Sequence, residues 1–392
     1  MSYRILTLNK ISHQGLKRFP SDEYEIGNAV STPDAILVRS QDMHDMDIPT
    51  SVKAIARAGT GTNNVPVAQM SARGVPVFNA AGANANAVKE LVLAGMLLAA
   101  RNIVPALQFT AGLQGDDQAL HAQVEAGKKQ YAGIELHGRT LGIIGLGAIG
   151  RLVADTALAL GMRVYGFDPA LTVDAAWSLP SQVKKAHSVE ELLKHSDFVT
   201  VHVPLLDSTR KLINAERLQV MKAGAVLLNF SRDAIVDSEA VLARLSGKHL
   251  RAYVCDFPAE RLQGVPNVIT LPHLGASTEE AEEYCAVMVV DQVREFLENG
   301  NLTNTVNFPT LVMPRESAHR LAIANANVPN MLGQISTVLA QAGINIRNMM
   351  NKSRGDMAYT LVDTDSVIPA AVLAQLGAIS GVLSVRALAE VA

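Results

Sequence analysis

The stretch that decides the fold runs from residue 141 to residue 168 and reads LGIIGLGAIGRLVADTALALGMRVYGFD. It opens with an apolar run, Leu141–Ile144, which is short and β-branched enough for a buried parallel strand. Three glycines follow in the spacing G-x-G-x-x-G: Gly145, Gly147 and Gly150. The next residues carry one apolar helical face, and a second strand-like run leads to Asp168. The order strand, glycine turn, helix, strand predicts a βαβ unit.

Each of the three glycines has its own function if a dinucleotide binds here. Gly145 allows the tight turn, Gly147 lets the backbone approach a pyrophosphate, and Gly150 lets the helix pack close to the strand. The start of the helix offers unpaired N–H groups and a positive dipole end to phosphates. Asp168, 18 positions after Gly150, completes the context that the motif requires. The stretch therefore predicts a dinucleotide site.

Asp168 also predicts which dinucleotide binds. Its carboxylate can accept hydrogen bonds from the ribose hydroxyls of NAD, and it repels the additional phosphate of NADP. Two like charges at ~4 Å repel by about 1 kcal/mol in water and about 4 kcal/mol near a protein surface. A repulsion of about 1 to 4 kcal/mol corresponds to a preference for NAD over NADP of roughly one to three decades in affinity. We therefore expect NAD.

The composition excludes several classes of protein. With 392 residues, of which 48% are hydrophobic, the chain is long enough for two or three domains with large cores. Its 34 Lys and Arg nearly balance its 37 Asp and Glu, which argues against nucleic acid as a partner. With only two cysteines, the chain is not expected to form a disulfide framework. Its His and Cys residues do not have the spacing of a metal-binding site. Because no signal-like segment and no long apolar run are present, we expect a cytoplasmic protein without a membrane partner.

The sequence before residue 283 predicts two α/β lobes. Residues 1–100 alternate strands and helices, with strands at 3–8, 35–38, 53–56 and 76–78, and a helix over 87–107 leads to a polar, poorly patterned segment at 114–138. Six strand candidates follow, at 141–144, 163–167, 198–203, 225–230, 250–255 and 268–271. A helix at 277–297 then crosses back to the first lobe. We expect two doubly wound, Rossmann-like parallel sheets around a cleft: a discontinuous substrate-binding domain (1–100 and 283–310) and an NAD-binding domain (101–282).

A third pattern follows a linker at 309–314. It runs strand 320–324, helix 331–342, strands 345–351 and 357–362, helix 368–379 and strand 382–388. This β-α-β-β-α-β order predicts a ferredoxin-like domain over 317–392. The domain carries no plausible set of acid, base and nucleophile, so we expect a regulatory or binding role.

Three titratable residues follow successive strands of the predicted NAD sheet: Arg232, Glu260 and His273. Ligands of doubly wound folds bind at the carboxyl ends of the strands, so these side chains should lie near one another. A histidine such as His273 suits a general base for an alcohol proton, because the imidazole is the side chain that ordinarily titrates near neutral pH. Glu260 would orient its imidazole, and Arg232 suits a bidentate contact to a carboxylate. The three together predict oxidation of a 2-hydroxy acid.

The segments GLGAIGR, LLNFSRDAIVD, FPAE and LPHLGAST, within residues 1 to about 310, resemble the D-isomer-specific 2-hydroxyacid dehydrogenase family. The resemblance places the family's catalytic residues at Arg232, Glu260 and His273. It implies NAD contacts from the following residues: Gly145, Gly147, Ala148, Ile149, Gly150, Asp168, His202, Phe230, Ser231, Arg232, Asp256, His273 and Gly275. One position departs from the family pattern. The usual Asp five residues before the catalytic Glu is Cys255 here, and the acid is Asp256.

The C-terminal pattern resembles an ACT domain. Its combination with the dehydrogenase segments resembles the branch of the family that oxidises 3-phospho-D-glycerate to 3-phosphohydroxypyruvate, the first step of phosphorylated L-serine biosynthesis. The resemblance implies substrate contacts from two loops of the first lobe and one further asparagine: Arg39, Ser40, Arg57, Gly59, Thr60, Gly61 and Asn84. Arg39 and Arg57 each follow a strand and suit a phosphate. Two alternatives stay open: a different 2-hydroxy acid, including reduction of 2-oxoglutarate, or a non-catalytic NAD-sensing interaction protein.

The ACT-like segment also carries candidate effector residues. In serine-inhibited relatives, a histidine and asparagines bind the amino acid, and the matching positions here are Asn325, Asn327 and Asn345. L-Serine is therefore a candidate effector, and a dimerising domain without a ligand is the alternative. The usual Pro-Gly turn is Pro329-Asn330, and Asn tolerates the left-handed backbone that such a turn needs. Long helices around the NAD domain and ACT edge strands predict a homodimer or homotetramer.

Overall fold

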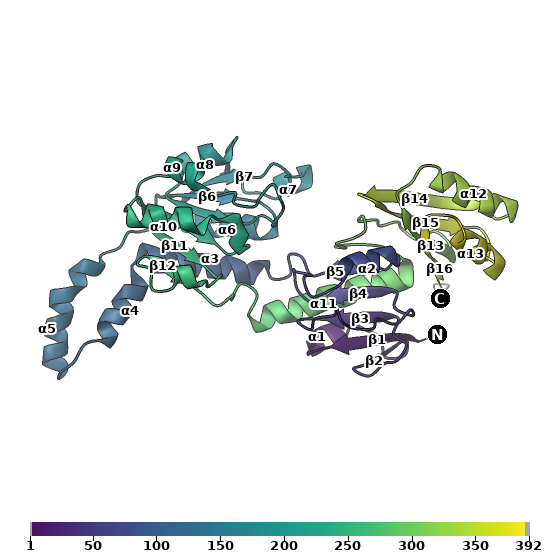
Figure 1. The fold of residues 1–392 in the computed structure, drawn as a ribbon, viewed down its shortest axis with the longest axis horizontal. Helices are drawn as coiled ribbons and strands as arrows, with labels where there is room; N and C mark the ends of the chain where they lie inside the picture. The colour runs from purple at the N-terminus through teal and green to yellow at the C-terminus, as the bar shows by residue number, and fades with distance from the viewer. Residues whose placement is uncertain (1, 389–392) are drawn as a thin grey trace. The chain divides into compact units, whose positions relative to one another are not determined.

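The computed structural model describes residues 2–388 and contains three sheets. The chain forms two compact units (Figure 1). The first runs to Asn84 and resumes at Thr278, and the second is Ala85–Ser277. The predicted fold class is confirmed: two parallel α/β sheets and a C-terminal antiparallel sheet with the β-α-β-β-α-β order.

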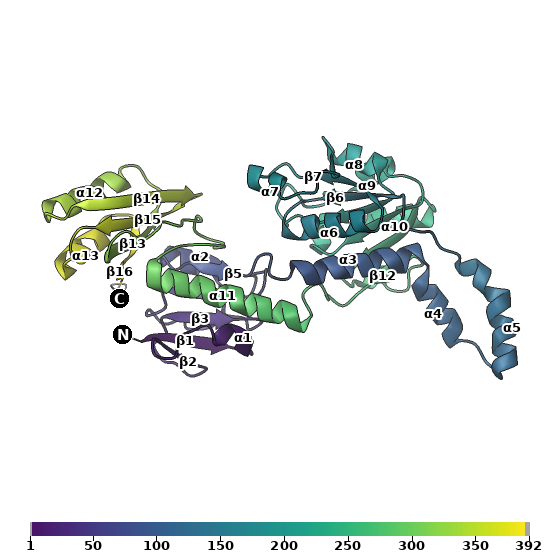
Figure 2. The ribbon, with the colours of Figure 1, turned by 180° about the vertical axis from the view of Figure 1, so that it is seen from behind.

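The first unit is built on a five-stranded parallel sheet in the order β2-β1-β3-β4-β5. The strands are β1 (Tyr3–Leu8), β2 (Tyr24–Gly27), β3 (Ala35–Val38), β4 (Ala54–Arg57) and β5 (Val77–Asn79), with short helices α1 (His13–Leu16) and α2 (Val67–Ala72) between them. The sequence predicted four strands and missed β2, because this edge strand exposes Glu25 and Ile26 and has no apolar run. Helix α11 (Glu279–Asn299) packs against β4, β5 and α1, as Figure 2 shows, and belongs to the first unit.

The second unit is built on a seven-stranded parallel sheet in the order β12-β11-β10-β9-β6-β7-β8. Its strands are β6 (Thr140–Ile144), β7 (Arg163–Phe167), β8 (Lys184–Lys185), β9 (Phe198–Val201), β10 (Ala225–Asn229), β11 (Leu250–Cys255) and β12 (Val268–Thr270). All six predicted strands are present, and the additional β8 is a two-residue edge strand of exposed lysines. The strand order reverses between β6 and β9, which is where doubly wound sheets bind their ligands.

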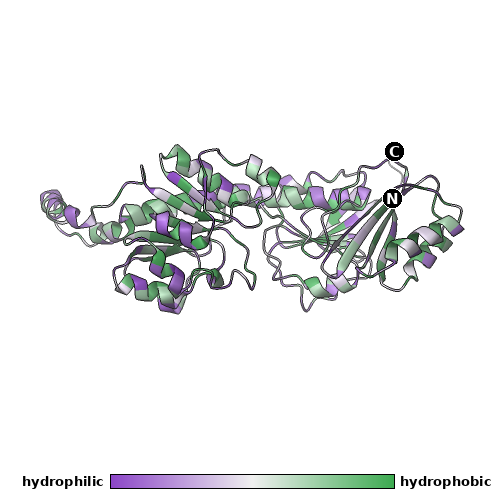
Figure 3. Ribbon diagram, turned by 90° about the horizontal axis from the view of Figure 1, so that it is seen from above, coloured by the Kyte–Doolittle hydropathy of each residue, from purple (hydrophilic) through white to green (hydrophobic). Residues whose placement is uncertain are grey.

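Helices α6 (Ala148–Ala159), α7 (Val173–Trp177), α8 (Val189–His195), α9 (Ala215–Val220) and α10 (Ser238–Ser246) connect these strands, with short 3-10 turns η2 (Asp233–Ile235) and η3 (Glu260–Leu262). The strands of both parallel sheets are largely hydrophobic, whereas the surrounding helices present mixed faces (Figure 3).

The prediction of one continuous helix over 87–107 is wrong. The segment forms two helices, α3 (Ala85–Ala100) and α4 (Ile103–Ala111), because Asn102 adopts a left-handed backbone with φ 52°. The polar segment after them is also helical, with α5 (Asp117–Gly127) and the 3-10 turn η1 (Lys128–Tyr131). Within residues 2–388 no single helix has the length and composition to span a membrane; only the bent pair α3 and α4, at 65°, does so together.

The C-terminal sheet has the order β14-β15-β13-β16 and is fully antiparallel. Its elements are β13 (His319–Ala326), α12 (Met331–Gln341), β14 (Ile346–Arg354), β15 (Met357–Thr364), α13 (Ala370–Gly377) and β16 (Val382–Leu388). Asn330 precedes α12 with a left-handed φ of 62°, as the sequence predicted for the Pro329-Asn330 turn.

The boundaries of the units differ from those that the sequence placed. Helix α3 belongs to the second unit, because it packs on α6, β10 and β11. The second boundary falls at Ser277–Thr278, where Thr278 caps α11 by accepting a hydrogen bond from the Ala281 N–H. The C-terminal sheet is grouped with the five-stranded sheet in one unit.

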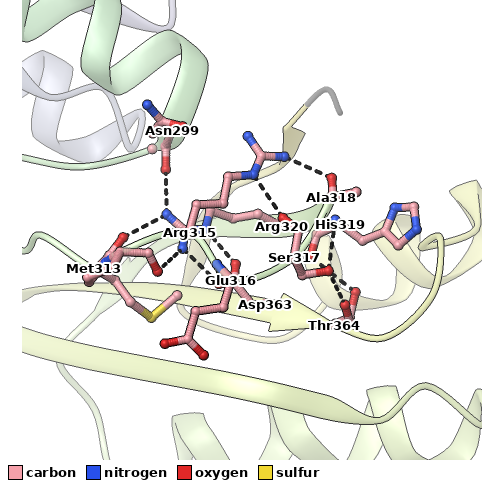
Figure 4. A network of polar contacts seen from close by, with 12 residues as sticks. Asn299, Met313, Arg315, Glu316, Ser317, Ala318, His319, Arg320, Asp363 and Thr364 are labelled. Carbon is pink, nitrogen blue, oxygen red and sulfur yellow. Dashed lines mark hydrogen bonds and ion pairs between the residues drawn. The ribbon is translucent and has the colours of Figure 1, made fainter. Parts of the chain in front are cut away.

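A network of arginines joins the C-terminal sheet to the last turn of α11 (Figure 4). Arg320 and Asp363 form a fully buried ion pair in which Arg320 Nε donates to Asp363 Oδ1 over 2.5 Å. Arg320 also donates to the carbonyls of Asn299, Met313 and Pro314. Arg315 donates to the Glu298 carbonyl, and the Tyr359 hydroxyl donates to that of Gly300. The donors to Glu298, Asn299 and Gly300 satisfy carbonyls at the end of α11 that would otherwise lack partners.

Candidate active site

The glycine turn after β6 has the geometry that its spacing predicts. Gly145 has φ 93°, and a Cβ there would lie 2.4 Å from the His202 carbonyl oxygen. A Cβ on Gly150 would lie 2.0 Å from the Gly145 oxygen, so α6 packs directly on the turn. A Cβ on Gly147 would meet nothing within 4 Å. The backbone at Gly147 is thus open to a ligand, while Gly145 and Gly150 are required by packing.

Helix α6 begins at Ala148, with Ile149 and Gly150 in its first turn, and its N-cap Gly147 provides no side-chain hydrogen bond. The first N–H groups of α6 are therefore available to an anion. Asp168 follows β7 beside them. Its Oδ2 accepts from the Leu146 N–H over 2.9 Å and its Oδ1 from the Ala170 N–H over 2.9 Å. The fixed carboxylate of Asp168 fits the ribose of NAD. The open backbone at Gly147 and the uncapped start of α6 fit its pyrophosphate.

Three of the predicted cofactor residues follow β9 and β10. His202 is partly buried, its Nε2 lies 3.0 Å from Thr200 Oγ1, and its Nδ1 is buried without a partner among the described residues. Burial lowers the pKa of His202 to about 3, so this ring is neutral in ordinary buffers. Phe230 is 6% exposed, and Ser231 Oγ donates to the Val201 carbonyl over 2.6 Å. These residues line the end of the sheet that the glycine turn occupies.

His273 follows β12 in a strained conformation. Its φ of 53° is left-handed, and its N–H donates to the carbonyls of Asp256 and Leu271. Its ring meets the Phe257 ring edge to face, with 5.4 Å between centroids. A strained residue is one that the surrounding structure holds in place, as is common at functional sites. The exposed ring of His273 is thus fixed against β11 and its loop.

Asp256 is brought to His273, although the sequence places it one residue later than the family pattern. The residue is 1% exposed, its Oδ2 accepts from the Gly275 N–H over 3.3 Å, and its Oδ1 has no partner among the described residues. Burial raises the pKa of Asp256, whereas the positive charges of His273 and Arg232 lower it. Cys255, in contrast, is buried, and its Sγ lies 3.8 Å from the Phe257 carbonyl. The acid therefore lies beside two predicted catalytic residues.

A pocket of about 460 Å³ lies at this end of the sheet, lined by Asp233, Asp256, Phe257, Pro258, Pro272 and His273. Arg232 is exposed, and its Nη1 donates to the Ser231 carbonyl. Glu260 is exposed at the start of η3, and among residues 2–388 no hydrogen bond or ion pair joins it to His273. The predicted Glu260–His273 pairing stays a prediction.

Four residues that line this pocket were not among the predicted site residues: Asp233, Phe257, Pro258 and Pro272. Asp233 has a buried Oδ1 without a partner among the described residues, and its Oδ2 lies 3.4 Å from Arg261 Nη2. Its position directly after Arg232 was the available signal. Phe257 gave no signal, because an aromatic residue after a strand is usually part of a core.

The predicted substrate loops of the first unit gather at the carboxyl ends of β3 and β4. Arg57 Nε donates to the Arg39 carbonyl over 2.9 Å, and a Cβ on Gly59 would lie 1.8 Å from Arg57 Nη1. Thr60 Oγ1 donates to Asn84 Oδ1 over 3.2 Å. Gly61 continues the same loop, and the N–H of Ser40, next to Arg39, donates to Asn9 Oδ1. The sheet thus brings the seven predicted residues to one end of this unit.

One contact in these loops was not predicted. Arg39 Nη2 donates to Glu282 Oε1 over 2.5 Å, so one of the two phosphate candidates is paired with a carboxylate of α11. Both side chains remain more than a third exposed.

The candidate effector residues are separate from these loops in the chain: Asn325 lies on β13, Asn327 just after it, and Asn345 just before β14. Asn325 is 1% exposed on β13, where its Nδ2 donates to the Ala326 carbonyl and its Oδ1 has no partner among the described residues. Asn327 Nδ2 donates to the Gly355 carbonyl, and the Asn345 N–H donates to Asp365. No group of three or more His, Cys, Asp or Glu in the described part of the chain has the arrangement of a metal site.

The family assignment follows from comparison with known proteins. The family model "D-isomer specific 2-hydroxyacid dehydrogenase, NAD binding domain" matches residues 94–275. The D-3-phosphoglycerate dehydrogenase of Escherichia coli strain K12 is 30% identical over 386 residues, which cover 94% of this chain and 90% of that enzyme. The chain belongs to the D-isomer-specific 2-hydroxyacid dehydrogenase family. It is an NAD-dependent dehydrogenase by this assignment, and its second unit is the NAD-binding domain.

One further relative and one solved structure are also similar to this chain. The D-3-phosphoglycerate dehydrogenase of Methanocaldococcus jannaschii is 34% identical over 330 residues; the match covers 82% of this chain but only 60% of that enzyme. The crystal structure of D-mandelate dehydrogenase from Rhodotorula graminis shares the fold with a TM-score of 0.67 at 22% identity, covering 80% of this chain and 100% of that one.

Proposed function

We propose that this dehydrogenase oxidises 3-phospho-D-glycerate to 3-phosphohydroxypyruvate, and so catalyses the first step of phosphorylated L-serine biosynthesis. The observation that supports this substrate is the arrangement of Arg39, Arg57 and the Gly59–Gly61 loop at one end of the five-stranded sheet. Two guanidinium groups beside backbone and amide donors suit a phosphate and a carboxylate on one small molecule. Relatives that carry the name D-3-phosphoglycerate dehydrogenase at 30–34% identity agree with it.

Three residues of the second unit have separate roles in the proposed reaction. The His273 imidazole takes the proton from the substrate hydroxyl, and Glu260 orients that ring and stabilises its charged form. Arg232 holds the substrate carboxylate beside the reacting carbon through a bidentate contact. NAD, when bound, accepts the hydride. In the reverse direction the charged His273 returns the proton to the ketone.

Arg39 provides the sharpest test of the phosphorylated substrate, and Arg18 is its matched control. Arg18 also pairs with a carboxylate of α11, Asp291, at 2.6 Å, and is similarly exposed. The Arg39→Gln variant should raise the Michaelis constant for 3-phospho-D-glycerate roughly 10- to 100-fold, because a charge-assisted hydrogen bond contributes about 1.5–3 kcal/mol. Arg18→Gln should not change it. If both variants keep the wild-type Michaelis constant, Arg39 does not bind the substrate phosphate and this support for a phosphorylated substrate fails.

We further propose that the C-terminal sheet is an ACT regulatory domain that binds L-serine through Asn325, Asn327 and Asn345. The unpartnered, buried Oδ1 of Asn325 supports this, since an ammonium group would satisfy it. Millimolar L-serine should inhibit the wild-type enzyme and leave Asn325→Ala uninhibited. Equal activity with and without L-serine would assign the domain to association of subunits, as a homodimer or homotetramer.

A further inference from the structure

A cavity of about 250 Å³ lies within the first unit, between the five-stranded sheet and the C-terminal sheet. We call it the junction pocket. Its polar and aromatic lining includes Lys53, Arg73, Phe296, Tyr359, Ser384 and Arg386. These residues come from the segments before β4 and after α2, from α11, and from β15 and β16. None of the residues that line it belongs to the glycine turn or to the predicted substrate loops.

The walls of the junction pocket are in close contact. Ser384 Oγ donates to the Gly74 carbonyl over 3.1 Å, and a Cβ on Gly74 would lie 2.8 Å from that same Oγ. Gly74 also has a left-handed φ of 69°, so only glycine fits without strain. The C-terminal sheet thus packs closely against the segment after α2, and the cavity lies beside this contact.

Arg386 is the residue that points to a ligand. Its guanidinium stacks on the Phe296 ring at 4.3 Å, and its Nη2 donates to the Leu297 carbonyl over 3.1 Å. Its Nη1 is buried and has no hydrogen-bond partner among the described residues. A buried guanidinium nitrogen without an acceptor costs more than an ordinary lost hydrogen bond, and native structures rarely contain one without a water or ion.

The charges around the pocket are unbalanced. Three cations line it, and none of its described lining residues is an Asp or Glu. Asp34 pairs with Lys53 over 2.7 Å, and Arg73 donates to the carbonyls of Ile48 and Pro49. One carboxylate therefore faces three positive charges, which leaves a net charge of about two at a partly enclosed site.

We propose that the junction pocket binds a phosphate group, either inorganic phosphate or the phosphate of a small ester. A doubly charged oxyanion matches the charge excess, provides an acceptor for Arg386 Nη1, and fits the cavity volume. Arg73 is positioned by its hydrogen bonds to backbone carbonyls, and Arg386 by its stacking on Phe296. Both arginines are therefore in place before a ligand binds. Because Arg386 also donates to the last turn of α11, bound phosphate strengthens the attachment of the C-terminal sheet to that helix.

Lysine labelling measures occupancy at this pocket without using enzyme activity. Lys53 and Lys222 are matched: each donates to a carboxylate that also accepts a backbone N–H, Asp34 or Asp197, and their side chains are 39% and 37% exposed. The full-length protein is acetylated briefly in potassium phosphate or in potassium chloride of equal ionic strength, and the two lysines are quantified by mass spectrometry. Phosphate should slow labelling of Lys53 several-fold in a saturable manner and leave Lys222 unchanged.

A pair of arginine variants assigns this protection to the pocket. Arg386→Lys keeps the charge but removes the unpartnered nitrogen, so protection of Lys53 should need at least about ten times more phosphate. The control is Arg251→Lys, because Arg251 likewise donates to carbonyls at the end of a helix, those of Ala99 and Ala100 of α3. Parallel titrations with 3-phospho-D-glycerate decide between the two sources of the phosphate group, since protection by the ester shows that a phosphorylated metabolite fits.

The outcome is independent of the proposed substrate. Arg39→Gln should leave protection of Lys53 unchanged, so failure of the substrate assignment does not affect this result. The proposal is overturned if phosphate protects neither lysine, protects both equally, or protects Lys53 equally well in the Arg386→Lys protein.

Discussion

Arg39 and Glu282 form an ion pair at 2.5 Å, so an arginine proposed to bind the substrate phosphate is already held by a carboxylate. A phosphate and Glu282 therefore compete for the same guanidinium. Glu282→Gln should lower the Michaelis constant for 3-phospho-D-glycerate by roughly two- to fivefold, because exposed ion pairs contribute about 0.2–1 kcal/mol. Asp291→Asn, which breaks the comparable Arg18 pair on the same helix, is the control and should have no effect. A raised Michaelis constant in the Glu282→Gln enzyme would show that Glu282 positions Arg39 for binding instead of competing.

The buried pair of Arg320 and Asp363 should dominate the stability of the C-terminal junction. Both side chains are 0% exposed, and Asp363→Asn leaves the guanidinium charge uncompensated. We expect the free energy of unfolding to fall by about 3–5 kcal/mol, measured by urea unfolding and circular dichroism. Glu125→Gln breaks the exposed Lys128 pair on α5 and should cost less than about 0.5 kcal/mol. Equal losses in the two variants would contradict this account of the junction.

His202 should make the second unit less stable in acid. Its pKa is about 3 in the folded state and about 6.5 when unfolded, so the unfolded chain binds the additional proton between these values. Stability is therefore complete above about pH 6.5 and falls as the pH is lowered toward 3. On the order of 1–3 kcal/mol should be lost between pH 7 and pH 4. His202→Gln should flatten this part of the stability profile, and His187→Gln, at an exposed position, should not. An unchanged profile in His202→Gln would mean that folding does not lower the pKa of this ring.

Asp168 should set the preference for NAD over NADP. Asp168→Asn keeps an acceptor for the Leu146 or Ala170 N–H and removes the charge that repels the NADP phosphate. The ratio of kcat/KM with NAD to that with NADP should fall roughly 10- to 1000-fold. Asp155→Asn, at an exposed position of α6, serves as the control for a charge change on the same unit. A ratio that stays at the wild-type value would assign cofactor choice to other residues.

The comparison of sequence and structure shows which physical signals a sequence carries. Buried parallel strands such as β6 and β10 are predicted because all their residues except Thr140 and Asn229 are apolar or glycine, and the glycine turn is predicted because its spacing reflects backbone geometry. Strand β2 was missed because an edge strand does not need an apolar run. The break at Asn102 was missed because one left-handed residue interrupts an otherwise continuous apolar pattern.

The pairings between distant side chains were the least predictable part. Arg320 and Asp363 are charged residues in strand-like runs, and such residues are almost always exposed unless a partner far along the chain is buried with them. The same holds for Arg39 with Glu282, which are 243 residues apart. The departure at Cys255 and Asp256 was visible in the sequence, but only the structure shows Asp256 reaching the Gly275 N–H.

The most direct test of the proposed reaction is the consumption of NADH with 3-phosphohydroxypyruvate, followed by the loss of NADH absorbance. The wild-type enzyme should oxidise NADH, and His273→Asn should lower kcat by about 10²- to 10⁴-fold while NADH binding, measured by fluorescence, is retained. The control is His249→Asn, which should keep the wild-type kcat. His249 lies in the same unit and forms a hydrogen bond with the Met221 carbonyl. No oxidation of NADH by the wild-type protein, or equal turnover by His273→Asn, would contradict the account.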